Sequence, residues 1–447
     1  MRNINPQTFK SSSLFAVPLE NLIPKDHPKR TILDKLPWDD LERIAKRAYK
    51  SDYWKDKPNA RIMIGLLVYH SLNLKKDYRE IAEDYTFNLF CAYACGYKTF
   101  DCLRKINHST LIKFEEHLGE ENLLEIKDII EKASIDAQPP NSKGRHSSDS
   151  TVIESNVTFP TDTKLMEAAR KFLVNDIIKS YQNQVNQDHR HYDRVARQEY
   201  LNFCKTRIHS HKDIQKAKKK HLQFLKRNIG QAQEVLNAIE EKLKDQEIIF
   251  DGNNGLNRKA FKRLKIKLET AKLIYKQQHD LYNDISVKDR IVSFHRPSVR
   301  PIFRGKAQKK TEFGVKVYLS RVGKALIINK TSYDNFYDGH GLQEGITSMQ
   351  KKDYSVKEII GDKGHSGCSN FLKNFNITDG LEKRGKQSKD PPIPKKRFVR
   401  ARNQTEGLIG TLKWIFIGAG GLRAKTDFGD TKTIFKAAIG FNLTYAF

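Results

Sequence analysis

Two runs of apolar residues at alternating three- and four-residue spacing lie in the middle of this 447-residue chain and limit the folds open to it. One run extends from Leu222 to Leu243 and the other from Phe261 to Ile285. Such spacing puts the apolar side chains on one stripe of a helix, and two such stripes bury each other. The segment 251–255 between them holds two glycines and predicts a turn. We therefore predict an antiparallel helical hairpin, inserted into the rest of the chain at about residues 165–288.

Patterns typical of β-strands lie on both sides of the predicted hairpin. After it, residues around Gly323 alternate in polarity in the way of a two-stranded hairpin with one buried face. Strands together with helices in one segment predict a mixed α/β domain. The strands are expected at residues 151–153, 157–159, 312–319, 325–328 and 356–360, and later helices at 402–414 and 434–446.

The first 133 residues predict an all-helical domain. The apolar stretch Arg61 to Leu72 and the segment Asp77 to Tyr85 each fit a helix. Ser109 or Thr110 is expected to cap a further helix at residues 111–118. A helix, a short turn and a capped helix in a basic chain are typical of a helix-turn-helix DNA reader. The same pattern also occurs in helices that only pack against other helices, so both interpretations stay open.

A linker is expected between the helical domain and the mixed domain. Residues 134–148 contain Pro139, Pro140, Gly144 and four serines, which is the composition of a connecting segment. We therefore expect a helical DNA-binding domain at 1–133, a linker at 134–148 and an α/β domain at 149–447.

The chain carries a large excess of positive charge. It has 81 Lys and Arg against 53 Asp and Glu, a formal net charge of +28, and an isoelectric point of about 9.7. Such an excess attracts polyanions, so we expect the partner to be double-stranded DNA. The basic outer faces of the predicted hairpin either follow a phosphate backbone or are the solvated side of a coiled coil.

Signals for targeting, membrane insertion and disulfides are missing. No window of about 18 apolar residues could span a membrane, and residues 1–15 lack the apolar core of a secretory signal. The five cysteines are an odd, scattered set, which favours reduced thiols. Cys91, Cys95 and Cys102 precede His108 but lack the spacing of a zinc knuckle. We therefore expect a cytoplasmic protein, with buried thiols rather than a zinc site.

Three carboxylates occupy positions that suit chemistry. Asp149 leads a predicted strand, Asp362 ends the strand at 356–360, and Glu406 lies on a predicted helix. If the three converge, they repel one another unless divalent cations lie between them, and oxygen ligands suit Mg²⁺ or Mn²⁺. Two such ions about 4 Å apart activate a water or hydroxyl and stabilise the leaving 3′ oxygen of a phosphodiester. From spacing alone, solvated turn residues are the alternative.

Three blocks of sequence resemble the signature blocks of bacterial insertion-sequence transposases of the DDE class. They begin at Asp149 (DSTVIE), Gly361 (GDKGH) and Arg402 (RNQTEG). The family's Tyr-x2-Arg-x3-Glu-x6-Lys signature falls on four residues of the third block, and the tyrosine position holds valine. These four are Val399, Arg402, Glu406 and Lys413.

The N-terminal segment also resembles the helical domain that precedes the catalytic core in one branch of this family. Pro58 to Arg61, Tyr78 to Ala82 and His108 to Leu111 carry that likeness. The predicted helical hairpin falls within the long gap between the two aspartates and is the part least covered by the resemblance.

The resemblance implies an RNase H-like catalytic core, in which a mixed sheet carries the acids. Asp149, Asp362 and Glu406 would then bind two Mg²⁺ or Mn²⁺ ions. The implied reaction cuts DNA at the ends of an insertion sequence and joins the 3′ hydroxyl to target DNA. The resemblance also implies that the protein acts as a homodimer on DNA, in the bacterial cytoplasm at the nucleoid.

Cations flank the predicted acids. Arg402 and Lys413 share a face with Glu406 if the helix is regular, and they would clamp phosphates rather than form surface salt bridges. Lys363 and His365 either reach backbone phosphate or face solvent. Trp414 is expected in the core.

Three alternatives stay open at this stage. An RNase H-like nuclease without strand transfer would share the three acids. A non-catalytic DNA-binding protein derived from a transposase is disfavoured because all three acids are present. A purely structural coiled-coil protein would explain the hairpin but not the blocks on either side of it.

Overall fold

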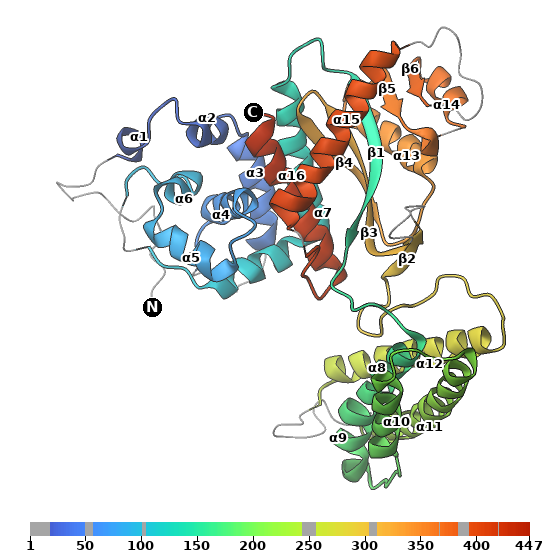
Figure 1. Cartoon of the computed structure of the whole chain (residues 1–447). Helices are drawn as coiled ribbons and strands as arrows, with labels where there is room; N and C mark the ends of the chain where they lie inside the picture. The colour runs from blue at the N-terminus through green and yellow to red at the C-terminus, as the bar shows by residue number, and fades with distance from the viewer. Residues whose placement is uncertain are drawn as a thin grey trace. The chain divides into compact units, whose positions relative to one another are not determined.

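The computed structural model describes residues 18–49, 57–100, 104–243, 256–303, 311–365, 367–382, 393–418 and 420–447 (Figure 1). The chain forms two compact units. The first unit joins Met1–Asn156 with Gly314–Phe447, and the second is the intervening Val157–Phe313. The two units are taken in turn below.

A mixed sheet forms the centre of the first unit. Its six strands follow the order β2-β3-β1-β5-β6, where β2 is Arg300–Phe303, and β4 also pairs with β3. Strand β3 pairs antiparallel with β4 and β1, while β5 pairs parallel with β1 and β6. The tight turn from β3 to β4 contains Gly323, whose φ of 59° is the left-handed conformation that glycine favours. The bounds are β1 (Arg145–Glu154), β3 (Thr311–Val322), β4 (Ala325–Ser332), β5 (Glu358–Gly361) and β6 (Thr378–Leu381).

The predictions for β3, β4 and β5 are confirmed, but two others differ from the structure. The first strand is longer than expected and begins at Arg145, so Asp149 lies within it rather than leading it. The strand expected at residues 157–159 is wrong. Pairing between β1 and β3 ends at Glu154 opposite Gly314, and the chain leaves the sheet there. The Glu154 carbonyl then accepts a hydrogen bond from the Leu422 N–H at 2.8 Å.

Helices cover both faces of the sheet. Tyr318 of β3 lies in a core with residues of α13 and α14, whereas its neighbours Val317 and Leu319 lie in the core with α7 and α16. This alternation is the period of a strand buried on two sides. The helix α15 packs on β1 and β5, as Figure 1 shows. The bounds are α7 (His108–Asp136), α13 (Asp338–Lys351), α14 (Ser369–Asn374), α15 (Lys395–Thr411) and α16 (Asp427–Tyr445).

The N-terminal segment is helical, as predicted. An acidic capping box of Asp77 and Glu80 begins α5. The cap of α7 is Asn107, whose side chain accepts from the Ser109 N–H at 2.9 Å, so the expected cap at Ser109 or Thr110 is wrong. The other bounds are α1 (Leu19–Leu22), α2 (Pro28–Asp34), α3 (Trp38–Ala45), α4 (Ala60–Leu72), α5 (Tyr78–Phe87) and α6 (Leu89–Ala94).

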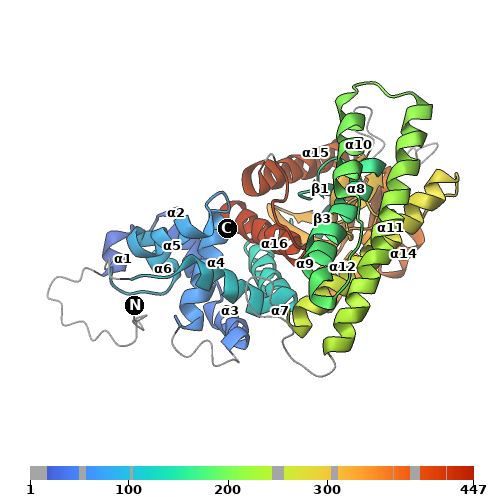
Figure 2. The ribbon, with the colours of Figure 1, turned by 90° about the horizontal axis from the view of Figure 1, so that it is seen from below.

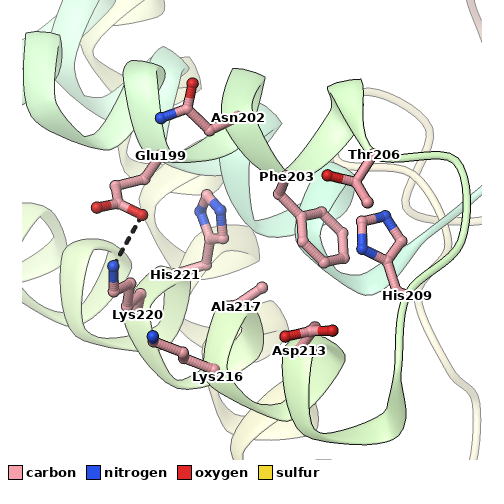
Figure 3. Close-up of a pocket in the computed structure, with 10 residues that line it drawn as sticks. All are labelled: Glu199, Asn202, Phe203, Thr206, His209, Asp213, Lys216, Ala217, Lys220 and His221. Atoms are coloured by element: carbon pink, nitrogen blue, oxygen red, sulfur yellow. Dashed lines mark ion pairs between the residues drawn. The ribbon is translucent and has the colours of Figure 1, made fainter.

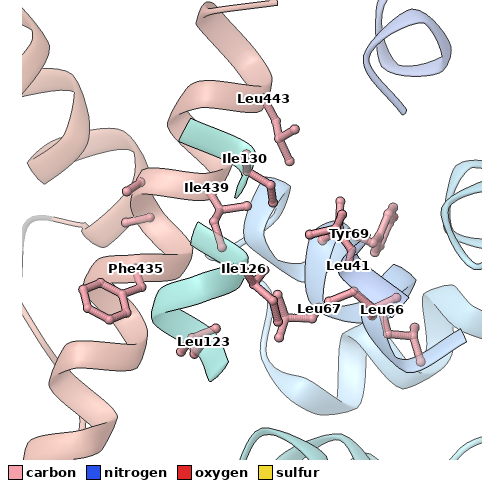
Figure 4. Packing of buried hydrophobic residues seen from close by; sticks show 14 of the residues in the cluster. Leu41, Leu66, Leu67, Tyr69, Leu123, Ile126, Ile130, Phe435, Ile439 and Leu443 are labelled. Atoms are coloured by element: carbon pink, nitrogen blue, oxygen red, sulfur yellow. The ribbon is translucent and has the colours of Figure 1, made fainter. Parts of the chain in front are cut away.

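One apolar core joins the N-terminal helices to the C-terminal helix. Figure 4 shows side chains of α3 and α4 packed with those of α7 and α16, and all of them are buried. This shared core explains why contacts place the N-terminal helices and the sheet in one unit. The expected linker is correspondingly short, because α7 ends at Asp136 and β1 begins at Arg145. Members of the core include Leu41, Leu66, Leu67, Leu123, Ile126, Ile130, Phe435 and Ile439.

A buried ionic cluster crosses this core. The Lys436 Nζ lies 2.7 Å from Glu115 Oε1 and 2.7 Å from His70 Nδ1. Lys432 contacts the other Glu115 oxygen at 2.9 Å. Lys436 is 2% exposed and Glu115 is 3% exposed, so these charges satisfy one another away from water.

The second unit is a helical bundle with a core of its own. The two predicted heptad runs form α11 and α12, which pack together, and the turn expected at 251–255 lies outside the described residues. Helix α8 and the π-helical turn after it, Leu173–Ile178, also pack on α11, so the unit is more than a two-helix hairpin (Figure 2). The bounds are α8 (Asp162–Phe172), α9 (Lys179–Tyr181), α10 (Asp193–Lys205), α11 (His211–Leu243), α12 (Arg258–Tyr282) and β2 (Arg300–Phe303).

Two smaller predictions concern membranes and thiols. None of the helices in the described part of the chain is long and apolar enough to cross a membrane. Cys91 and Cys95 are buried free thiols, as expected, and Cys102 lies outside the described residues.

Candidate functional site

Two of the predicted acids follow directly after residues that are paired between β1 and β5. Ser147 of β1 pairs with Ile360 of β5, and the strands are parallel. Asp149 lies two residues after Ser147, and Asp362 lies two residues after Ile360, directly after the end of β5. Neighbouring strands lie about 4.8 Å apart, and residues two apart share a face. Asp149 shares a face with Ser147, which contacts Thr405 of α15, whereas the Asp362 carboxylate contacts His365, which packs against Tyr318 on the α13 side of the sheet.

The Asp362 carboxylate is held by its own loop. Its Oδ1 accepts from the Gly364 N–H at 2.9 Å and lies 2.9 Å from His365 Nδ1. The hydrogen bond from His365 is the largest cause of a lowered pKa at Asp362. Burial opposes it, while the His365 charge, the Gly364 N–H and Arg402 add to it. Asp362 is therefore ionised at neutral pH and faces one defined direction.

His365 is buried between Asp362 and Tyr318. Its side chain is fully buried, and its Nε2 lies 3.1 Å from the Tyr318 hydroxyl. The expectation that His365 reaches backbone phosphate does not fit this burial. A Cβ at Gly364 would lie 2.9 Å from Asp362 Oδ1 and 2.9 Å from Asp338 Oδ2, so a larger residue there would displace these carboxylate groups.

Helix α15 is fixed to the sheet one residue before Glu406. Thr405 is buried, and its hydroxyl donates to Ser147 Oγ at 2.8 Å. Glu406 follows on the outer side of the helix with 60% of its side chain exposed, and its Oε1 lies 3.6 Å from Arg402 Nη2. Arg402 therefore lies next to Glu406, and its positive charge also lowers the pKa of Asp362.

A fourth acid, Glu382, joins this edge of the sheet. Its N–H donates to the Gly361 carbonyl at 3.0 Å, which places it beside Asp362 at the end of β6. Its carboxylate accepts from Arg402 at 3.2 Å and lies 3.5 Å from Lys363. Sequence reasoning missed Glu382, because the strand before it, Thr378–Leu381, has the sequence TDGL and shows no apolar pattern.

The structure brings the predicted residues together only in part. Asp149 and Asp362 follow paired residues of β1 and β5, and Glu406 lies on α15, paired with Arg402. Among the described residues, no group of three His, Cys, Asp or Glu side chains is arranged to hold a metal ion. A metal-binding geometry would therefore require Glu406 to move from Arg402 toward the aspartates.

The end of α15 differs from the prediction. The α-helix ends at Thr411, and Lys413 lies in a π-helical turn, Leu412–Ile417, so a regular face shared by Arg402, Glu406 and Lys413 is wrong. Trp414 was expected in the core but is 66% exposed. Val399, at the position of the family's tyrosine, is also exposed.

The helical unit contains a separate hollow of about 330 Å³ between α10 and α11 (Figure 3). The rings of Phe203 and His209 stack there with centroids 3.9 Å apart. Glu199 pairs with Lys220 at 2.8 Å, and Asp213 accepts from the Ser210 hydroxyl at 2.6 Å. Since both acids already have partners, this hollow resembles a packed junction between helices more than a metal site.

Comparison with known families assigns the N-terminal part of the chain. Residues 17–117 match the transposase domain family DUF772, and this segment covers the helices from α1 to the start of α7. The match supports a transposase family. No curated protein and no solved structure matches the chain.

Proposed function

We propose that this chain is a DDE-class DNA transposase that cuts at the ends of an insertion sequence and joins the 3′ hydroxyl to target DNA. The observation that supports the proposal is the parallel pairing of β1 with β5, two residues before Asp149 and Asp362, together with the packing of α15, the helix that bears Glu406, on both strands. The transposase domain match at residues 17–117 and the net charge of +28 support it independently.

The sheet is compatible with the RNase H-like core that the sequence resemblance implies. Three strands pair antiparallel and two are parallel to β1, with helices on both faces. Asp362 lies at the carboxyl end of its strand, and ligands of α/β sheets bind outside such ends. The donor set of Asp149, Asp362 and Glu406 consists of carboxylate oxygens, which suit Mg²⁺ or Mn²⁺.

These three carboxylates would hold two divalent cations. When bound, such ions activate the attacking water or hydroxyl and stabilise the leaving 3′ oxygen. His365 and Gly364 keep the Asp362 carboxylate oriented and ionised. No covalent protein intermediate is required, because the same site can serve cleavage and joining in turn.

Arg402 links DNA binding to the assembly of the site. It is shared between Glu382 and Glu406, and an incoming phosphate would compete for its guanidinium. Once Arg402 turns to phosphate, Glu406 loses its partner and is available to the metal ions. Lys363, with 58% of its side chain exposed, is placed to contact the same strand. Lys413 would contact phosphate from the π-helical turn.

The reaction implies further partners. Two DNA ends must be held at once, so we propose a homodimer on DNA in the bacterial cytoplasm, at the nucleoid. The N-terminal helices are proposed to bind double-stranded DNA of the element ends.

The test is cleavage of labelled end-sequence DNA with and without Mg²⁺ or Mn²⁺. Asp149→Ala, Asp362→Ala and Glu406→Ala should each abolish cleavage while DNA binding in EDTA is kept. Glu344→Ala on α13, which removes an exposed acid paired with Lys330, is the matched control and should cut normally. A fully active variant at any of the three positions would remove that residue from the site.

An RNase H-like nuclease without strand transfer is the second candidate, since it would use the same three acids. Supercoiled target DNA separates the two: joined products require the transposase. Intact DNA binding with no cleavage under any metal would instead favour a non-catalytic DNA-binding protein derived from a transposase.

A further inference from the structure

A basic pocket of about 350 Å³ lies under the first half of α15, at the opposite end of β5 from Asp362. Side chains from β1, β3, β5 and α15 line it, and four of them are arginines. The residues that matter to its charge are Arg145, Arg321, Glu358, Arg397, Arg400 and Gln404.

The arginines outnumber the acids of this pocket. Glu358 is the acid among the lining residues, and it is already engaged by Arg397 through both carboxylate oxygens. Arg321 donates to the neutral Gln404 side chain at 2.7 Å, and its buried Nε has no partner. Burial and the nearby charge of Arg400 lower the pKa of Arg321.

Two of the four arginines, Arg145 and Arg400, have no acidic partner among the described residues. The side chains of Arg145 and Arg400 make no ion pair or hydrogen bond with the part of the chain that the structure describes, and both residues are exposed. Four guanidinium groups around one hollow repel one another, and an anion between them removes that repulsion. Guanidinium groups bind phosphate through two parallel hydrogen bonds, which makes phosphate the anion that suits this pocket.

We infer that this pocket binds a backbone phosphate of DNA. The inference rests on the proposed function and adds a second contact for the strand that reaches Asp149. Ser147 lines the pocket and lies two residues before Asp149 on the same face, and Arg145 lies four residues before it. At about 3.3 Å per strand residue and about 3.4 Å of DNA axis per nucleotide, the bound phosphate lies roughly two to four nucleotides from the one at Asp149.

The experiment measures binding of the full chain to end-sequence duplex in EDTA over a range of salt concentrations. The test variant is Arg145→Gln with Arg400→Gln, because both side chains are exposed and support no contact in the fold. The control is Lys351→Gln with Lys373→Gln, which removes two exposed cations from α13 and α14 on the other face. We expect the test variant to reduce the slope of log K against log salt by about 0.9, one phosphate contact, and the control to leave it unchanged.

A second arm separates DNA from small phosphorylated molecules. Pyrophosphate should compete with DNA for the pocket of the wild-type protein. In the test variant, pyrophosphate should no longer reduce DNA binding. An unchanged salt slope in the test variant would overturn the inference, and so would pyrophosphate binding that DNA does not displace.

The failure of the inference and that of the proposed function are distinguishable. Wild-type protein that binds and cuts DNA, together with a test variant of unchanged slope, would reject only the pocket. Wild-type protein that binds no DNA would reject both. Circular dichroism of each variant checks that the fold is intact.

Discussion

Arg402 of α15 donates to Glu382 at the end of β6, with Nη1 and Oε2 3.2 Å apart. This ion pair joins the helix that bears Glu406 to the strand next to Asp362. Lys363 lies 3.5 Å from the same carboxylate. Glu382 thus engages the two cations that the proposed reaction would direct at phosphate.

Replacing Glu382 should therefore strengthen DNA binding. In Glu382→Gln, Arg402 and Lys363 lose their acidic partner, and the negative charge that opposes phosphate disappears. We expect affinity in EDTA to rise about two- to fivefold, which corresponds to about 0.5 to 1 kcal/mol. Glu344→Gln, remote from this edge, is the control. Weaker binding of Glu382→Gln would show that Glu382 positions Arg402 instead of competing for it.

Removing Arg402 should have the opposite effect. Arg402→Ala is expected to weaken DNA binding and to reduce the salt slope by about 0.9, one phosphate contact. Fluorescence anisotropy at several salt concentrations measures both quantities. An unchanged slope would mean that Arg402 remains with Glu382 and Glu406 when DNA is bound.

His365 should control cleavage through Asp362. In His365→Ala the Asp362 carboxylate loses a 2.9 Å hydrogen bond. Loss of a group that orients a metal ligand costs about 10- to 100-fold in activity or metal affinity. Cleavage should fall by that factor while DNA binding in EDTA stays unchanged. Tyr318→Phe, which removes only the outer hydrogen bond to His365, should have a smaller effect, and equal losses would contradict this order.

Acid should destabilise the fold partly through His70. Burial, followed by the charge of Lys436, lowers the pKa of His70 to about 3, and its Nδ1 accepts from Lys436 while Nε2 faces the Lys76 carbonyl. The unfolded chain binds this proton near pH 6.5, so folding stability falls as pH drops from about 6.5 to about 3, by up to about 1.4 kcal/mol per pH unit. His70→Gln should show a shallower dependence in urea melts between pH 4 and 7. The same slope in both proteins would exclude His70.

Glu115 should be essential to stability. Its two oxygens contact Lys436 and Lys432 inside the core. Glu115→Gln leaves buried ammonium groups without a counter-charge, which costs about 3 to 5 kcal/mol. Urea unfolding measures the loss. Glu116→Gln, on the exposed side of the same helix, should stay within about 0.5 kcal/mol of wild type, and a similarly small change for Glu115→Gln would contradict the prediction.

Local patterns predicted the elements whose apolar residues are regular. The heptad spacing located α11 and α12, and the alternation in residues 312–319 located β3. The beginning of β1 was missed because its residues Ser147 and Ser148 are polar. They are buried through Ser320, 2.7 Å from Ser148, and Thr405, 2.8 Å from Ser147. Such burial depends on partners far along the chain, which no local pattern contains.

The candidate site, like the fold, could be predicted from the sequence only in part. Asp149, Asp362 and Glu406 were selected through the resemblance to three signature blocks, and their shared role in a site stays a prediction. The pairing of Arg402 with Glu382 depends on how α15 packs against β6, and the burial of His365 depends on Tyr318. These relationships arise from tertiary packing, so they could not be predicted from local sequence patterns.

The helical unit leaves and rejoins the sheet at one place. Glu154 and Gly314 are direct partners across β1 and β3, so the 157 residues of Val157–Phe313 begin and end where a short hairpin turn could close the same two strands. The sheet thus carries the helical bundle as a removable cassette. A chain in which a few glycine and serine residues replace that cassette should lose β2 and the first residues of β3 but still pair β1 with the rest of β3 and with β5.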